Sequence, residues 1–348
     1  MKIMLLKKQI LTVLFLFLII SAAACAGCLN EGEGDHDHDR DAEGDHDHDH
    51  DAEGDHDHDH DAEGIHDHDH DHGDPDASYV PPDPEKMKDV ASGKAILAAV
   101  SVVPESEFVE KVGGDRVVVI TMIPPGAGHT YDPSPVQLAD LAKADIYFSL
   151  DSGEVFEDRY LETFRSSNPD MKIVSTSAGM DVKLKNGTAD PHIWMSPAKA
   201  AVMVENICSG LISVDPENAD YYTANKEAYL KELKELDDDM KASLAGKEGK
   251  AIIVYHPAWG HFTDEFGLRQ IAIELDGKEP TAKSLASLIR TAREENVRVV
   301  FVQEQLSKTA AISISEETGA EVVTLDPLAK DYVSNMKKTA EIMAEYMD

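Results

Sequence analysis

Short apolar runs alternate with longer stretches of helical periodicity from residue 94 to the end of the chain. This alternation is typical of a mainly parallel β-sheet with helices on both faces. In the first half the pattern predicts strands at 95–102, 116–121, 145–150 and 171–175, and helices at 104–112, 135–143, 155–166 and 197–212. In the second half it predicts strands at 251–255, 269–274, 297–302 and 321–325, and helices at 258–266, 281–295, 308–318 and 331–346.

One long amphipathic stretch separates these two halves. Between Pro216 and Gly246, aromatic and aliphatic residues fall at helical spacing among charged residues, which predicts a helix of about seven or eight turns. The predicted fold is therefore α/β, with two similar four-stranded βα lobes at 93–215 and 247–348. We expect the single helix at 216–246 to join them rigidly, with a cleft between the lobes.

The first 28 residues have the pattern of an export signal. Three lysines precede an uncharged apolar run at 10–20, which is short for a bilayer span and is followed by small residues, Cys25 and Cys28. Small residues directly before a cysteine resemble the lipobox of exported lipoproteins. We expect Cys28 to carry the lipid and to anchor the protein on the outer face of the cytoplasmic membrane. Lipidation at Cys25, or an uncleaved anchor helix, is the alternative.

Residues 29–92 form a low-complexity segment with a ten-residue repeat, and residues 79–93 read as a proline-rich linker. Between Glu31 and Asp76 there are 22 acidic residues and one arginine, a net charge of −21, and 12 of the protein's 16 histidines. This composition predicts disorder. Clustered imidazoles favour exchangeable metal sites, although a purely solvating acidic spacer is an alternative. The accessory metal-binding residues that we predict are His46, His48, His50, His56, His58, His60, His66, His68 and His70.

The composition of the whole chain argues against nucleic-acid binding and against a disulfide in the globular part. A net charge of −35 is the wrong sign for a nucleic-acid-binding protein. If Cys25 and Cys28 belong to the signal region, Cys208 is the one cysteine left in the globular part, which excludes an intramolecular disulfide there. We expect Cys208 to be a small buried core residue on a helix.

The remaining histidines are placed where ligands bind in α/β proteins. His129 and His256 follow predicted strands, and His192 precedes a predicted helix. Ligands in such folds bind beyond the carboxyl ends of the strands, so these side chains can converge from both lobes. Asp326 follows the last predicted strand, and three imidazoles with one carboxylate would make a tetrahedral zinc site.

Each of these residues also has a simpler interpretation. A single histidine is more often a surface or core residue than a ligand, and Asp326, before a proline, is suited to cap a turn. Glu304 is a competing oxygen donor. His261, five residues beyond His256, is expected to support the site or to lie on the surface.

From residue 94 onwards the chain resembles the cluster A-I solute-binding proteins of metal-uptake ABC transporters. The resemblance rests on HTYDPSP, DPHIWMSP, YHPAWGHF, FVQEQLS and LDPL. It implies metal coordination between two lobes by His129, His192, His256 and Asp326, and a long helix between the lobes. It also implies an ABC permease and its ATPase as partners, and we expect a monomer.

The identity of the metal follows from the third of these histidines. Members of the family that select manganese tend to have a carboxylate there, whereas this chain has His256, so zinc is the expected cargo and manganese or iron the alternative. We expect the protein not to be an enzyme, since motifs such as HExxH are absent from the sequence. A zinc hydrolase and an exported zinc buffer or adhesin are the competing hypotheses.

Overall fold

The computed structural model describes residues 79–182, 184–185, 188–275, 277–304 and 306–347. The predicted signal segment, Cys28 and the accessory histidines lie outside these residues. Among the residues that are described, no helix is both long enough and apolar enough to cross a membrane.

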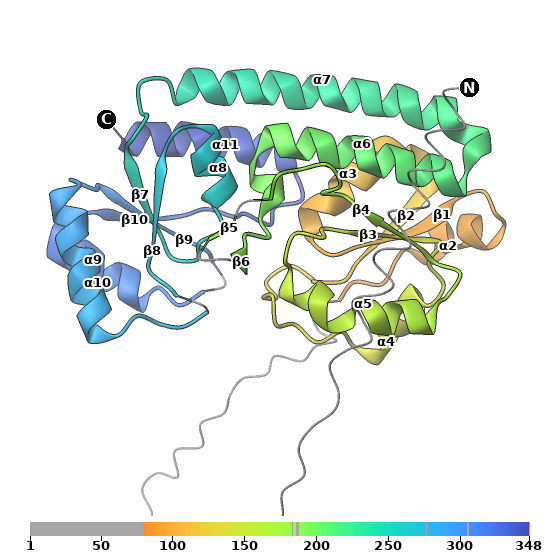
Figure 1. The fold of residues 1–348 in the computed structure, drawn as a ribbon, viewed down its shortest axis with the longest axis horizontal. Helices are drawn as coiled ribbons and strands as arrows, with labels where there is room; N and C mark the ends of the chain where they lie inside the picture. The colour runs from red at the N-terminus through yellow and green to blue at the C-terminus, as the bar shows by residue number, and fades with distance from the viewer. Residues whose placement is uncertain (1–78, 183, 186–187, 276, 305, 348) are drawn as a thin grey trace, which may run out of the picture. The chain divides into compact units, whose positions relative to one another are not determined.

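The first lobe is built on a four-stranded parallel sheet with the strand order β2-β1-β3-β4. Helices α3 and α6 contact its strands from one side, and α4 and α5 lie on the other side (Figure 1). The strands are β1 (Ile96–Val100), β2 (Val117–Thr121), β3 (Ile146–Ser149) and β4 (Lys172–Ser175), and the helices are α3 (Val103–Gly113), α4 (Pro135–Leu141), α5 (Val155–Ser167) and α6 (Pro197–Val214).

The second lobe repeats this arrangement with the order β10-β9-β7-β8, and all of its strand pairs are parallel. If the strands of each lobe are numbered 1 to 4 along the chain, both sheets have the same strand order, 2-1-3-4. Its strands are β7 (Ala251–Val254), β8 (Arg269–Ala272), β9 (Val299–Val302) and β10 (Glu321–Thr324), and its helices are α8 (Gly260–Glu265), α9 (Ala282–Glu294), α10 (Thr309–Thr318) and α11 (Tyr332–Tyr346). The predicted fold class is confirmed.

The two faces of the second sheet belong to different cores. Alternate residues of a strand point to opposite faces. On β7, Ile253 packs into a small cluster with residues of α9 and α10, whereas Ile252 and Val254 pack into the main core. That main core also contains the interior of the first lobe, so one buried apolar cluster runs through both lobes.

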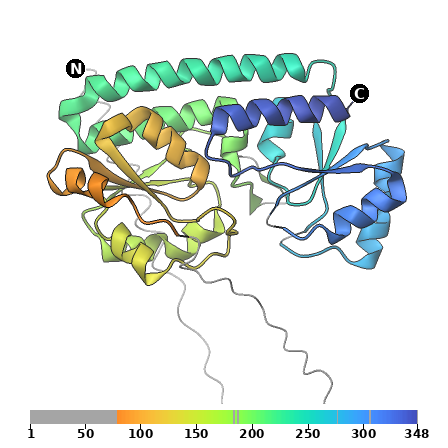
Figure 2. The same cartoon turned by 180° about the vertical axis from the view of Figure 1, so that it is seen from behind.

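The helix between the lobes is α7 (Ala219–Ser243), 25 residues long, after a short 3₁₀ turn at Pro216–Asn218. It contacts α3 and α6 of the first lobe and α11 of the second, and Figures 1 and 2 show it running along both α6 and α11. Its buried residues are Tyr222, Tyr229, Leu233, Leu236 and Met240. All five belong to the helical stripe that the sequence analysis identified.

Two elements were not anticipated. The segment interpreted as a linker at 79–93 contains helix α2 (Pro84–Ala91), where the Asp83 carboxylate accepts a hydrogen bond from the backbone N–H of Glu85 at 2.9 Å. None of its residues is fully buried, and Met87 and Val90 are partly buried against the main core, so its apolar pattern is short and the prolines suggested a linker. A short antiparallel pair, β5 (Leu184–Lys185) with β6 (Thr188–Ala189), precedes the DPH motif.

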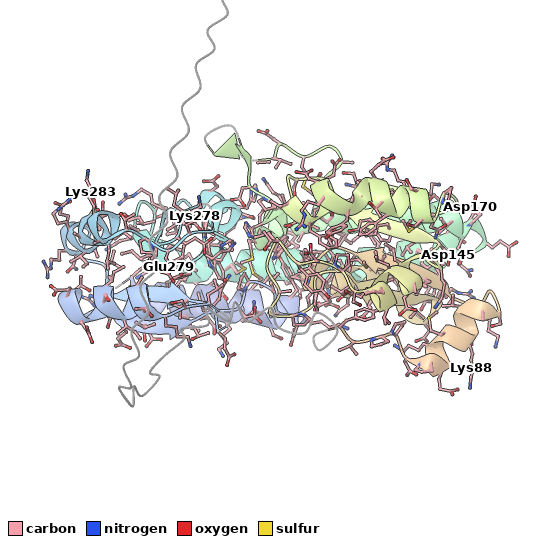
Figure 3. All side chains as sticks on the ribbon, turned by 90° about the horizontal axis from the view of Figure 1, so that it is seen from below. Lys88, Asp145, Asp170, Lys278, Glu279 and Lys283 are labelled. Atoms are coloured by element: carbon pink, nitrogen blue, oxygen red, sulfur yellow. The ribbon has the colours of Figure 1, made fainter. Side chains whose placement is uncertain are left out.

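Exposed charges surround this framework, and the one cysteine described is buried. Lys88, Asp170 and Lys283 are exposed and lie at the periphery of the molecule in Figure 3. Cys208 is on α6 with 4% of its surface exposed, as the sequence analysis predicted, and it carries a free thiol.

Candidate metal centre

Three histidines from widely separated parts of the chain converge on one point. The Nε2 atoms of His129 and His256 are 3.2 Å apart, and those of His256 and His192 are also 3.2 Å apart. One nitrogen from each ring lies within 4.8 Å of the other two. His129 and His192 belong to the first lobe and His256 to the second, so both lobes contribute to this cluster, which we call the histidine triad.

Each ring of the histidine triad is held from behind by a carboxylate. Glu154 lies 2.7 Å from Nδ1 of His129, Asp190 lies 2.8 Å from Nδ1 of His192, and Glu274 lies 2.7 Å from Nδ1 of His256. A carboxylate accepts a hydrogen bond, so each Nδ1 carries the proton and each Nε2 presents a lone pair. This is the orientation that metal-binding histidines need.

Local structure explains where the three carboxylates come from. Glu154 is the N-cap of α5, in the loop after β3, and it accepts a hydrogen bond from the backbone of Phe156 at 3.2 Å. Asp190 also accepts from the backbone N–H of His192 at 3.1 Å, which fixes the DPH turn. Glu274 follows β8, the strand that pairs with β7 in front of His256. The sequence analysis missed these three residues.

The histidine triad has an uneven electrostatic environment. Burial lowers the pKa of His192 to about 4, against the opposing effect of Asp190. Burial also acts to lower the pKa of His129, but the hydrogen bond and charge of Glu154 outweigh it and raise that pKa above its usual value. Near neutral pH the buried His192 ring is therefore neutral, whereas the His129 ring holds a proton more readily.

The loop that carries His129 is tied to α5. Arg159 donates to the carbonyl of Thr130 at 3.1 Å and to the carboxylate of Asp132 at 2.7 Å, and Tyr160 also donates to Asp132. One helix therefore supplies both Glu154, which orients the ring, and the clamp that holds its loop. Neutral imidazoles that converge in this way are typical ligands of zinc and of other late transition metals.

Comparison with known proteins decides the family. The model of the zinc-uptake complex component A family, described as periplasmic, matches residues 96–346. The chain belongs to this family. It is 28% identical to the high-affinity zinc uptake system protein ZnuA of Bacillus subtilis over 285 residues, which cover 74% of this chain and 87% of that protein. It is 26% identical to the zinc-binding lipoprotein AdcA of Streptococcus pneumoniae and spans 54% of its length.

Solved structures agree with this assignment. A crystal structure of ZnuA matches with a TM-score of 0.70 and 38% identity over 73% of this chain and all of that one. The Zn(II)-bound ZnuA-like domain of Streptococcus pneumoniae AdcA matches with a TM-score of 0.64 and 25% identity, over 73% of this chain and 99% of that one. A laminin-binding protein of Streptococcus agalactiae, described as having adhesin and metal-transporting activity, matches with a TM-score of 0.66 and 25% identity, over 73% of this chain and all of that one.

The two predicted oxygen donors of this family member lie differently from the histidines. Asp326 follows β10, and one of its carboxylate oxygens accepts a hydrogen bond from the backbone N–H of Leu328 at 2.9 Å. This is the turn-capping interaction that the sequence analysis considered. Within the described residues its second oxygen accepts no hydrogen bond, and Asp326 is outside the group that meets within 4.8 Å. Glu304 is exposed and is likewise outside that group.

His261 is close to the histidine triad but is not one of its members. Only 2% of its surface is exposed, so it is not the surface residue that was one expectation. Its Nε2 lies 3.0 Å from the backbone oxygen of Asp190, and its Nδ1 lies 2.7 Å from the amino group of Lys199. It therefore contacts the segment that carries His192, which agrees with the other expectation, a supporting role.

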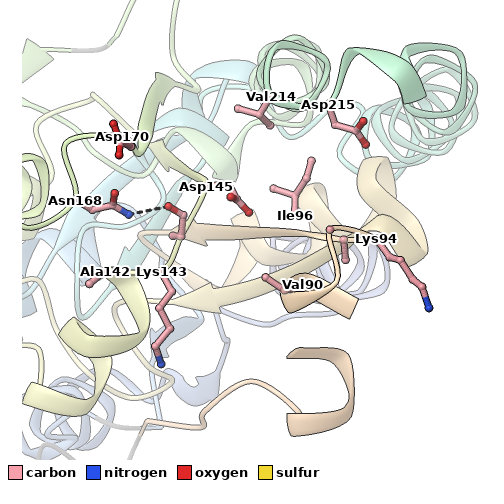
Figure 4. Close-up of a pocket in the computed structure, with 13 residues that line it drawn as sticks. Val90, Lys94, Ile96, Ala142, Lys143, Asp145, Asn168, Asp170, Val214 and Asp215 are labelled. Carbon is pink, nitrogen blue, oxygen red and sulfur yellow. Dashed lines mark hydrogen bonds between the residues drawn. The ribbon is translucent and has the colours of Figure 1, made fainter. Parts of the chain in front are cut away.

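A separate hollow lies at the opposite ends of the strands of the first lobe. Figure 4 shows it bordered by Lys94, Lys143, Asp145, Asn168 and Asp215. Its polar groups hold the chain: Asp145 accepts from the backbone of Leu97 at 2.8 Å, and Asn168 donates to the carbonyl of Ala144 at 2.8 Å. Among the described residues, the side chains of this hollow form no group of metal-ligand atoms that meet within 4.8 Å.

Proposed function

We propose that this protein captures extracellular Zn²⁺ and delivers it to an ABC permease and its ATPase. The observation that carries the proposal is the convergence of three Nε2 lone pairs, each set by a carboxylate on Nδ1. Membership of the zinc-uptake family and the likeness to a Zn(II)-bound domain support zinc as the cargo.

We propose Asp326 as the fourth ligand. It follows the last strand of the second lobe, at the end of the sheet where ligands of α/β folds bind, and one of its oxygens has no hydrogen bond within the described part of the chain. Three imidazoles and a carboxylate fill a tetrahedral zinc shell, so no position is left for a hydrolytic water. The relatives above are named for zinc uptake and metal binding, which is consistent with a binding protein and not with a zinc hydrolase.

We further propose that the protein is a monomer, anchored by a lipid on Cys28 to the outer face of the membrane. The signal pattern supports this placement, and the pneumococcal relative is named a lipoprotein. The histidines of residues 29–92 would then raise the local supply of zinc near the site by tethering exchangeable ligands to it.

The test is a zinc titration of a form of the protein that begins at Tyr79, with manganese in competition. We expect one tightly bound zinc, displaced only weakly by manganese and lost in His192→Ala. Asp326→Asn should weaken zinc binding, although the histidine triad and His261 are unchanged in this variant. A wild-type form that retains no zinc, or that prefers manganese, would contradict the proposed cargo.

The transport role needs a test in the cell. A strain that lacks this protein should grow poorly under zinc starvation, and the wild-type chain should restore growth whereas His192→Ala should not. Normal growth of the deletion strain would favour a zinc buffer or adhesin instead. Equal rescue by both chains would mean that the cellular role does not depend on the histidine triad.

A further inference from the structure

One histidine outside the triad links the two lobes behind the metal ligands. His261 lies on α8 of the second lobe, yet two contacts of its ring reach the first lobe. Its Nδ1 lies 2.7 Å from the amino group of Lys199, in the first turn of α6, and its Nε2 lies 3.0 Å from the backbone oxygen of Asp190. We call this chain of contacts from Lys199 through His261 to Asp190 the latch.

The partners of the ring define its protonation state. An ammonium group can only donate hydrogen bonds and a carbonyl oxygen can only accept them. Nδ1 of His261 is therefore the acceptor for Lys199, and Nε2–H is the donor to Asp190. Lys199 is itself held by the carbonyl of Asp181 at 3.1 Å, so the latch is anchored in the first lobe at both of its ends.

The latch ends on the residue that orients a metal ligand. Asp190 offers its carboxylate to Nδ1 of His192 and its carbonyl to His261, so the second lobe holds the backbone at the point from which the carboxylate projects. The next carbonyl, that of Pro191, accepts from the hydroxyl of Ser152 in the first lobe at 3.1 Å. The two carbonyls before His192 are thus bonded to different lobes, Asp190 to the second and Pro191 to the first.

The chain that follows His192 is also hydrogen-bonded to the second lobe. The indole N–H of Trp194 donates to the carbonyl of Pro327 at 2.8 Å, and Tyr332 donates to the carbonyl of Trp194 at 2.7 Å. These bonds fix the chain after His192 but leave Asp190 to the latch. Loss of the latch therefore releases the Asp190 carbonyl from the second lobe, while the Asp190 carboxylate keeps its hydrogen bonds to His192 and Trp194 keeps its own.

We propose that His261 is a positioning residue that sets His192 from across the lobe interface, with Lys199 holding its ring in the donating tautomer. The proposal rests on the proposed zinc-binding function, because it assigns a role within that site. Imidazole suits this position since one rigid ring accepts on one side and donates on the other. Partners that orient a metal-binding histidine typically contribute 10–100-fold to metal affinity.

The experiment compares zinc dissociation constants of full-length variants by competition with a chelator. His261→Phe removes both hydrogen bonds and keeps a ring of similar size, whereas His261→Gln keeps a donor toward Asp190. Thr263→Ala is the matched control, because Thr263 is equally buried on α8 but its hydroxyl bonds to Gly260 within the helix. A chain with alanine at all three triad positions measures zinc held by the histidine-rich segment alone.

We expect His261→Phe to raise the dissociation constant about 10–100-fold, His261→Gln to recover part of that loss, and Thr263→Ala to leave it unchanged. Lys199→Met should give an intermediate loss, since it frees the ring to change tautomer. Equal affinities of wild type and His261→Phe, or equal losses in His261→Phe and Thr263→Ala, would overturn the proposal.

A metal-free measurement separates this proposal from the zinc function. Nitrogen-15 spectra of the metal-free chain should show the Nε2–H tautomer of His261, and ring signals of His192 that shift in His261→Phe but not in Thr263→Ala. A chain that binds no zinc but shows these signals would overturn the function and leave the latch as a structural contact. An Nδ1–H tautomer of His261, or unshifted His192 signals, would overturn the latch itself.

Discussion

Burial and the neighbouring carboxylates act with different strength on His129 and His192, so these two rings differ in their affinity for protons. Burial acts to lower the pKa of His129, but Glu154 outweighs it, so this pKa is raised. Burial lowers the pKa of His192 to about 4. A metal must displace any proton bound to a ligand, so affinity falls as pH drops below the highest ligand pKa. The His129–Glu154 pair therefore contributes to the acid limit of zinc binding, the pH below which affinity falls.

We predict that Glu154→Gln moves this acid limit to lower pH. The amide removes the negative charge that raises the pKa of His129, so fewer protons compete, while zinc affinity at high pH falls about 10–100-fold because the ring is less firmly oriented and less basic. Zinc titrations between pH 8 and 5 would measure both effects. Glu162→Gln, on the exposed face of the same helix, should change neither, and a parallel shift in both variants would contradict this explanation.

The lowered pKa of His192 makes the stability of the metal-free fold depend on pH. Between pH 6.5 and about 4 the unfolded chain binds a proton at this ring that the folded chain does not, so this contribution to stability is lost as pH falls through that window. The lowering of the pKa of His192 from 6.5 to about 4 corresponds to about 3 kcal/mol at most. Acid unfolding midpoints of the wild type and His192→Gln would measure it; equal pH dependence of the two proteins would contradict it.

At this scale the sequence revealed the three histidines that converge but not the side chains that hold them. His129 and His256 were recognisable because they follow strands, and their triad with His192 is confirmed as a geometric cluster. Glu154 is 25 residues from His129, and Glu274 is 18 residues from His256. Nothing in a single sequence pairs such residues, because the contacts arise only when the strands before them are aligned in one sheet: β7 and β8 are neighbours, and β2 and β3 lie on either side of β1.

At the scale of elements, one buried carboxylate joins three helices. Glu107 on α3 accepts from the hydroxyl of Tyr229 on α7 at 3.0 Å and from the backbone N–H of Tyr332 on α11 at 2.8 Å. Burial raises the pKa of this carboxyl, and the two hydrogen bonds oppose that rise. The first lobe, the long helix and the second lobe are thus linked at one side chain.

We predict that Tyr229→Phe destabilises the whole protein by about 1–3 kcal/mol, because it leaves a buried carboxylate oxygen without its donor. Urea unfolding should remain a single transition, and zinc affinity should not change, since the substitution is outside the metal centre. Tyr221→Phe on the same helix is the control, because that ring is 38% exposed. An equal loss in the control, or a separate transition for one lobe, would contradict the linking role.

The elements themselves were largely predictable because their apolar patterns are strong. Buried parallel strands such as β1 are continuous apolar runs, and α7 carries a clear stripe. Helix α2 was missed because its apolar contact with the core is limited to the partly buried Met87 and Val90, although Asp83 and Pro84 form a recognisable helix start. The β5–β6 pair has only two residues in each strand, too few to show any alternation.

At the scale of the whole molecule, the lobes are joined by more than α7. The main apolar core continues through both lobes, and hydrogen bonds from Trp194 to Pro327 and from Tyr332 to Trp194 cross between them. A swinging motion would have to break this buried packing as well as bend α7. Breaking that packing costs more than the local change proposed for Asp326, which has to release one hydrogen bond, from the backbone N–H of Leu328, to bind a metal.

We therefore predict that zinc changes loops and not the arrangement of the lobes. Small-angle scattering of a form that begins at Tyr79 should give the same radius of gyration, within error, with and without zinc. Hydrogen exchange should slow in the loops around His129 and Asp326, because those residues exchange a proton or a hydrogen bond for a metal bond, and should be unchanged in α7. His192→Ala with zinc should match the metal-free protein. A clear compaction on zinc addition would mean that the cross-lobe bonds open in solution, and that closure of the lobes, not ordering of the loops, accompanies capture.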